Sequence, residues 1–121
     1  MLKFLIAAIV LVALDGVYLN LIKGHFNSQI RAVQGSDISV NYIGAGLTYV
    51  ILIFAINYFI IQRNRSPVDA AYLGFCIYGV YELTNYALLK SWSLTTVFID
   101  TLWGTILFFI TAFVVNKITS L

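Results

Sequence analysis

Charged side chains are scarce in this chain. Its 121 residues include seven Lys or Arg and five Asp or Glu, so that 10% are charged, whereas 61% are hydrophobic. Soluble domains carry about 25% charged residues. A chain of this length has too little interior to bury so much apolar side chain, and the excess has to face lipid. The composition therefore predicts one integral membrane domain over residues 1–121.

Several features that would indicate other functions are missing. The single cysteine, Cys76, excludes an internal disulfide, and we expect it to be buried because it lies in an apolar run. No basic run is interleaved with aromatic residues, which gives no support to nucleic acid as a partner. No phosphate-binding loop, nucleophile elbow or HExxH is present, which argues against ATP-driven work. The only histidine, His25, lies outside the apolar runs, so we assign no metal and no cofactor.

Four apolar runs stand out, each close to the roughly 20 residues that a helix needs to span the hydrocarbon core. They cover residues 2–22, 42–61, 68–89 and 95–115. Backbone polar groups in lipid must be satisfied within their own segment, which favours helices over open strands. The sequence therefore predicts an all-α fold, a bundle of four transmembrane helices.

The connections between these runs differ in length. Ser66 and Pro67 are typical of a helix start, so the third helix is expected to begin there. Residues 90–93 make a very short turn, which predicts that the third and fourth helices are antiparallel neighbours. The long connection, residues 23–41, has Phe26, Ile30 and Val33 at helical spacing. We interpret it as a short amphipathic helix on the membrane surface, with a solvated loop as the alternative.

Basic residues near the ends of the runs predict the orientation. Four lie on the side of the chain termini, namely Lys3, Arg63, Arg65 and Lys117. Three lie on the other side, namely Lys23, Arg31 and Lys90. Because cytoplasmic ends carry the excess of Lys and Arg, this count places both termini in the cytoplasm.

Three carboxylates lie inside the predicted spans, where a charge costs at least about 2.5–3.5 kcal/mol on insertion scales. Asp15 and Glu82 each lie eight residues before a lysine. At a rise of 1.5 Å per residue, each is therefore roughly 12 Å below the surface at which that lysine lies. Asp100 enters from the same side, about six residues past Leu94, or roughly 9 Å down. All three are predicted to lie at similar depth in one half of the bilayer.

Neighbours at helical spacing extend this acidic pattern. Spacings of three or four residues place Glu82 with Asn85 on one helix face and Asp15 with Tyr18 on another. If these faces turn inward, the bundle holds a polar pocket that opens toward residues 23–41. The candidate ligand-binding residues are Asp15, Tyr18, Tyr81, Glu82, Asn85, Asp100 and Trp103.

Three interpretations of this cluster stay open. In the first, the carboxyl groups are protonated or hydrogen-bonded and only lock the packing of a structural membrane component. In the second, they line a site for a lipid headgroup or small polar ligand, with one carboxyl protonated and one ionised. In the third, they belong to a small proton- or cation-coupled transporter that acts as an oligomer. The residues alone do not decide among these, nor whether the protein is an enzyme.

A resemblance to a known family rests on residues spread over most of the chain. They are Leu14-Asp15, Tyr18-Leu19, Phe26, Gln29, Tyr78-Gly79, Tyr81-Glu82-Leu83-Thr84-Asn85, Ala87, Leu89-Lys90, Trp92, Asp100 and Trp103-Gly104. The chain resembles the small bacterial membrane proteins grouped as domain of unknown function 2177. It departs from their usual pattern where Glu82 replaces an aspartate, Tyr18 a tryptophan and Ser93 a proline.

The resemblance implies a four-helix architecture in a bacterial inner membrane and points to the same polar residues, without implying a reaction. The chain has no long exposed segment on which a soluble partner could dock. We therefore expect its partners to lie in the membrane: lipids, a second copy of the chain, or other membrane proteins.

Overall fold

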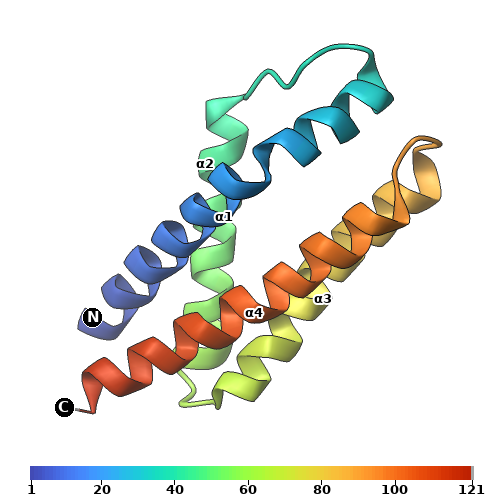
Figure 1. Cartoon of the computed structure of the whole chain (residues 1–121). Helices are drawn as coiled ribbons and strands as arrows, with labels where there is room; N and C mark the ends of the chain where they lie inside the picture. The colour runs from blue at the N-terminus through green and yellow to red at the C-terminus, as the bar shows by residue number, and fades with distance from the viewer. Residues whose placement is uncertain (121) are drawn as a thin grey trace.

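The apolar runs contain no internal proline, so each can form an unbroken helix. The computed structural model, which describes residues 1–120, has four α-helices. These are α1 (Leu2–Gln34), α2 (Tyr42–Ile56), α3 (Pro67–Leu88) and α4 (Leu94–Thr119), and α2 continues into a π-helical turn, η1 (Asn57–Ile61). Both chain ends lie at one end of the molecule, and the α1–α2 loop and α3–α4 turn at the other (Figure 1). The expected all-α fold is confirmed.

Helix α1 corrects the prediction of a separate short surface helix. It runs unbroken for 33 residues through the segment that was expected to form that helix, and Gly35 ends it with a φ of 80°. Nothing between residues 23 and 34 forces a break, since the segment has no proline and one glycine. At 1.5 Å per residue the helix is about 50 Å long, which exceeds a hydrocarbon core of about 30 Å.

Three of the helices are long and apolar enough to cross a membrane: Leu2–Gln34, Tyr42–Ile61 and Leu94–Thr119. Helix α3 does not meet this criterion, because it includes Asp69, Glu82 and Asn85 as well as several tyrosines. The helix nevertheless has 22 residues and begins as predicted, with the Ser66 hydroxyl accepting a hydrogen bond from the Asp69 N–H at 3.1 Å. The structure therefore supports a multi-pass protein with three candidate spans.

Helices α3 and α4 form the closest pair in the molecule, joined by the short turn that the sequence predicted. Two buried glycines allow this approach: a Cβ atom on Gly74 would lie 2.2 Å from the backbone oxygen of Gly104. Likewise, a Cβ atom on Gly104 would lie 2.1 Å from the Tyr78 ring. Small residues at such crossings let helix backbones pack closely within a membrane.

Helix α1 packs against α4, and α2 packs against α1 and reaches α3 through its π-helical end. The half of the bundle near the termini is filled by fully buried apolar side chains, among them Leu11, Ile56, Leu107 and Phe108. Cys76, expected to be buried, is exposed on α3. It lies on the side of α3 that does not face α4, so an apolar run alone does not show which residues are interior.

Candidate functional site

Asp15 is the carboxylate with the most complete set of partners. It lies on α1 with 7% of its surface exposed, and its two oxygens accept from different helices. Trp103 on α4 donates its indole N–H to Oδ1 at 2.9 Å, and Tyr49 on α2 donates its hydroxyl to Oδ2. Asp15 therefore joins three helices, and both of its oxygens are engaged.

Asp100 on α4 has the same small exposure, 7%. Its Oδ1 accepts a hydrogen bond from the Tyr18 hydroxyl at 3.2 Å. The Tyr18 ring stacks on Trp103 with ring centres 4.6 Å apart and planes within 5°. Aromatic stacking of this kind holds the hydroxyl in place. Asp100 is thus oriented by the Tyr18 hydroxyl, and its carboxyl group also lies within hydrogen-bonding reach of the Glu82 carboxyl group.

Glu82 on α3 is the most deeply buried of the three, with no exposed surface. Its Oε1 accepts from the indole N–H of Trp92 at 2.8 Å, and its carboxyl group lies within hydrogen-bonding reach of that of Asp100. The Trp92 side chain is 4% exposed and points back to Glu82 from the α3–α4 turn. All three carboxyl groups lie close enough to the Tyr18 hydroxyl to interact with it electrostatically. The buried acidic residues are therefore hydrogen-bonded inside the helix bundle.

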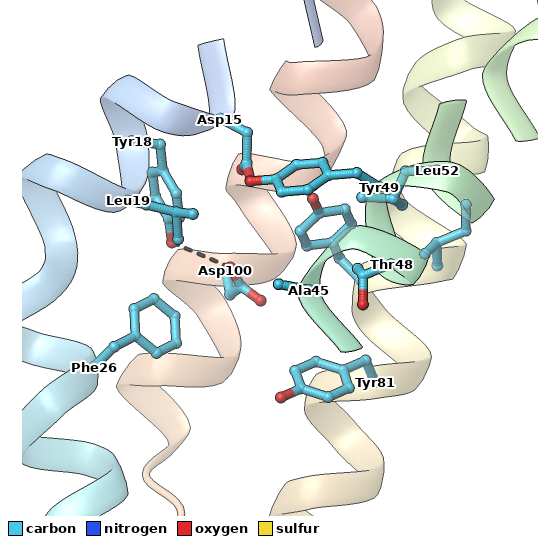
Figure 2. Close-up of a pocket in the computed structure, with 12 residues that line it drawn as sticks. Asp15, Tyr18, Leu19, Phe26, Ala45, Thr48, Tyr49, Leu52, Tyr81 and Asp100 are labelled. Carbon is cyan, nitrogen blue, oxygen red and sulfur yellow. Dashed lines mark hydrogen bonds between the residues drawn. The ribbon is translucent and has the colours of Figure 1, made fainter. Parts of the chain in front are cut away.

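A cleft of about 460 Å³ lies beside this cluster, with residues of all four helices in its wall. Figure 2 shows Tyr18, Leu19 and Phe26 on one side, Tyr81 on the other, and Asp100 between them, with Asp15 and Tyr49 side by side. The lining residues are Asp15, Tyr18, Leu19, Phe26, Ala45, Thr48, Tyr49, Leu52, Ile77, Tyr78, Tyr81 and Asp100. Leu19 is 46% exposed and Tyr81 56% exposed. The cleft is therefore open at the side of the bundle, where a membrane protein meets lipid.

The predicted site residues fall into two groups. Asp15, Tyr18, Tyr81 and Asp100 line the cleft. Trp103 lies behind it and positions Asp15 and Tyr18. Neither Glu82 nor Asn85 lines the cleft: Glu82 is enclosed between α3 and the α3–α4 turn, and Asn85 is partly exposed one turn farther along α3.

Two residues contribute more than the sequence indicated. Tyr49 is not among the predicted site residues, and its bond to Asp15 depends on how α2 packs against α1. Gln29 caps the α3–α4 turn: its side-chain N–H donates to the Ser91 carbonyl at 2.6 Å. Its oxygen accepts from the Ser93 N–H at 2.9 Å and the Thr96 hydroxyl at 2.7 Å. One indication of the importance of Gln29 was present in the sequence: it is among the residues that carry the resemblance to the family.

His25 and Gln29 lie on the part of α1 beyond residue 22, in the segment toward which the pocket is predicted to open. His25 Nε2 is hydrogen-bonded to the Thr96 hydroxyl at 2.8 Å. This end of α1 therefore braces the start of α4, close to the cleft, and Phe26 between the two contributes to its wall. Within residues 1–120, no three His, Cys, Asp or Glu side chains are grouped so that they could hold a metal ion.

The comparisons with known proteins settle the family. A family model described as a predicted membrane protein, DUF2177, matches residues 1–116. The chain belongs to this family. No curated protein and no solved structure matches the chain. The match confirms the resemblance that the motif residues indicated and a membrane location, and the family's description names no reaction.

Proposed function

We propose that the acidic cleft binds the polar head of an amphiphile within the membrane. The observation that carries this proposal is Asp100, a buried carboxyl group that lines the cleft together with Asp15 and Tyr18. Buried carboxyl oxygens are costly unless they accept hydrogen bonds. A ligand in the cleft that donates to Asp100 would add to the hydrogen bond from Tyr18 and would compete with Glu82 for this carboxyl group.

The chemistry of the wall favours a donor-bearing head and an apolar body. The indole of Trp103 and the hydroxyls of Tyr18 and Tyr49 already donate to Asp15 and Asp100, so the carboxylates act as acceptors. Leu19 and Leu52 provide apolar wall beside them. A hydroxyl or ammonium group fits this arrangement, and an acyl chain would leave the cleft at its exposed side, between the helices.

We also propose that α3 is a fourth membrane span and that both chain termini lie in the cytoplasm. Helix α3 packs along α4 and, at 22 residues, is about 33 Å long, enough to cross the hydrocarbon core. Its polar residue Glu82 is enclosed in the bundle, where a membrane helix places such groups. With both termini in the cytoplasm of a bacterial inner membrane, the cleft lies in the outer half of the bilayer.

The alternative functions fit different parts of the same cluster. A role restricted to packing suits Asp15 and Glu82, whose bonds join helices or a helix and its following turn. It leaves the cleft beside Asp100, which is open at the side of the bundle, without a role. Transport would need a polar path toward the termini, but the core on that side is closed by Leu11, Ile56 and Leu107. The geometry therefore favours binding over conduction.

The test is a competition among lipids in nanodiscs that contain equal parts phosphatidylethanolamine, diacylglycerol and phosphatidylcholine. The first has a primary ammonium, the second a hydroxyl, and the third no donor in its headgroup. We expect the protein to retain the first or second over the third when it is released into mild detergent and weighed by native mass spectrometry. Asp100→Asn should weaken retention of the ammonium lipid roughly tenfold, since a charge-assisted hydrogen bond is lost.

Two further variants make this test specific. Ala45→Phe fills the cleft but leaves every carboxylate in the sequence, and it should abolish the preference among the lipids. Asp37→Asn, which removes a carboxylate from the exposed α1–α2 loop, should leave it unchanged. Equal retention of all three lipids, or a preference that survives Ala45→Phe, would overturn the proposal.

A further inference from the structure

A second groove lies at the opposite end of the molecule, near the chain termini, and is separate from the acidic cleft. Its volume is about 380 Å³. It lies between the π-helical end of α2 and the start of α3, and is lined by Phe59, Ile60, Arg63, Arg65, Asp69 and Leu73. Half of this wall is apolar and half is charged, with two guanidinium groups against one carboxylate.

The backbone holds both arginines at the edge of this groove. The Arg65 N–H donates to the Ile60 carbonyl at 2.9 Å, and the Asn64 N–H to the Ile61 carbonyl at 3.2 Å. These two bonds, with Asn64 in the left-handed conformation at a φ of 54°, form the motif that commonly closes a helix. The reversal at Asn64 lets Arg63 and Arg65 both reach the groove from a rigid turn.

Both guanidinium groups are held in place by neighbouring residues, and both keep N–H groups that can bind a ligand. Arg63 is stacked over the Tyr58 ring at 4.6 Å, and its Nε donates to the Tyr58 carbonyl at 3.2 Å. Its terminal nitrogens, which are the ones that grip an oxyanion, take no part in that bond. Arg65 lies 3.6 Å from Asp69 with both side chains largely exposed, and such pairs contribute little.

We propose that this groove binds the phosphate group of an anionic phospholipid. Arg63 and Arg65 would hold the phosphate oxygens, and an acyl chain would lie along Phe59 and Leu73. Guanidinium groups suit phosphate because they present paired N–H donors. The groove faces the end that carries both termini, where the excess of basic residues predicts the cytoplasmic leaflet, and anionic lipids concentrate there. A lipid is favoured over free phosphate because half of the wall is apolar.

The experiment uses the full chain in nanodiscs of equal parts phosphatidylglycerol and phosphatidylcholine, with retained lipid counted by native mass spectrometry. The double variant Arg63→Gln with Arg65→Gln is expected to lower the retention of phosphatidylglycerol roughly tenfold. The matched control, Lys3→Gln with Lys117→Gln, removes the same charge from the same end without touching the groove. It should retain the lipid as the unmodified chain does.

Asp69→Asn gives a result in the opposite direction. It removes the carboxylate that competes with the lipid for Arg65, so retention of phosphatidylglycerol should rise. If retention falls instead, the Arg65–Asp69 ion pair maintains the groove and does not compete with a lipid, which would overturn the proposal. Equal losses in the arginine and lysine variants would also overturn it, because they would mean diffuse attraction. Displacement of the lipid by millimolar inorganic phosphate would contradict the role of the acyl chain.

Discussion

At the scale of single residues, the three buried carboxyl groups have different surroundings and, on this account, different roles. Asp15 joins α1 to α2 and α4 through two donors. Glu82 ties the end of α3 to the turn that follows it. Asp100 accepts from Tyr18, lies beside Glu82 and lines the cleft. Sequence spacing placed them at one depth, but only their partners show which are engaged in packing and which is available to a ligand.

The role of Asp15 in joining helices can be tested by Asp15→Asn. The amide keeps one acceptor oxygen and replaces the other with an N–H donor. Either Trp103 loses its acceptor in a buried site, or the Tyr49 hydroxyl has to reverse and accept from the amide. We expect the free energy of unfolding to fall by about 1–3 kcal/mol. The measurement is unfolding in mixed micelles with increasing sodium dodecyl sulfate, followed by tryptophan fluorescence.

The control for that measurement is Asp37→Asn. Asp37 pairs with Arg31 at 2.6 Å, but both side chains are more than half exposed, so the change should cost at most about 1 kcal/mol. If Asp15→Asn proves no more costly than Asp37→Asn, the hydrogen bonds of Asp15 do not hold the bundle together.

At the scale of the helices, close approach between α3 and α4 depends on Gly74. Its missing Cβ would meet the backbone oxygen of Gly104, which cannot move aside as a flexible side chain could. Gly74→Ala should therefore separate the helices and destabilise the protein by about 1–3 kcal/mol in the same unfolding assay. Gly46→Ala is the matched control, because its Cβ would meet nothing within 4 Å. Equal effects would show that helix propensity, not packing, controls both sites.

The elements also show how far sequence reasoning reaches. The start of α3 followed from a capping serine and a proline, both local signals. The length of α1 did not, because the pattern of Phe26, Ile30 and Val33 fits a continuing helix as well as a separate one. Gln29 acts through residues that are 62 to 67 positions away in the chain, and no local pattern reports such a contact.

The candidate site was predictable to the same extent. Depth and helical spacing identified Asp15, Tyr18 and Asp100, since burial of a carboxylate in lipid needs a reason. The same reasoning could not separate Glu82 from them. Whether a buried carboxyl group lines a cleft or is enclosed depends on the rotation of its helix and on the tryptophan that reaches it, here Trp92.

At the scale of the whole molecule, the account predicts four spans with both termini on the cytoplasmic side. Single cysteines placed in a Cys76→Ser background test this by labelling with a membrane-impermeant maleimide in intact cells. Ser39→Cys and Ser91→Cys, in the α1–α2 loop and the α3–α4 turn, should be labelled from outside. Gln62→Cys and Ser120→Cys should be labelled only after the membrane is opened.

The pair Gln62→Cys and Ser91→Cys tests α3 in particular, because the two positions flank that helix. Labelling of both from the same side would mean that α3 does not cross the membrane. Labelling of Ser120→Cys from outside, with Ser39→Cys protected, would reverse the orientation and move the acidic cleft to the inner half of the bilayer.

The central claim is that the cleft beside Asp100 holds the head of an amphiphile. The most direct measurement is a crystal structure of the protein grown in a lipid mesophase that contains phosphatidylethanolamine. The account predicts elongated density that enters between the helices at Leu19 and Tyr81 and ends at hydrogen-bonding distance from Asp100. A cleft closed by Tyr78 and Tyr81, with Asp100 bonded to protein groups alone, would contradict it and leave the acidic cluster a packing device.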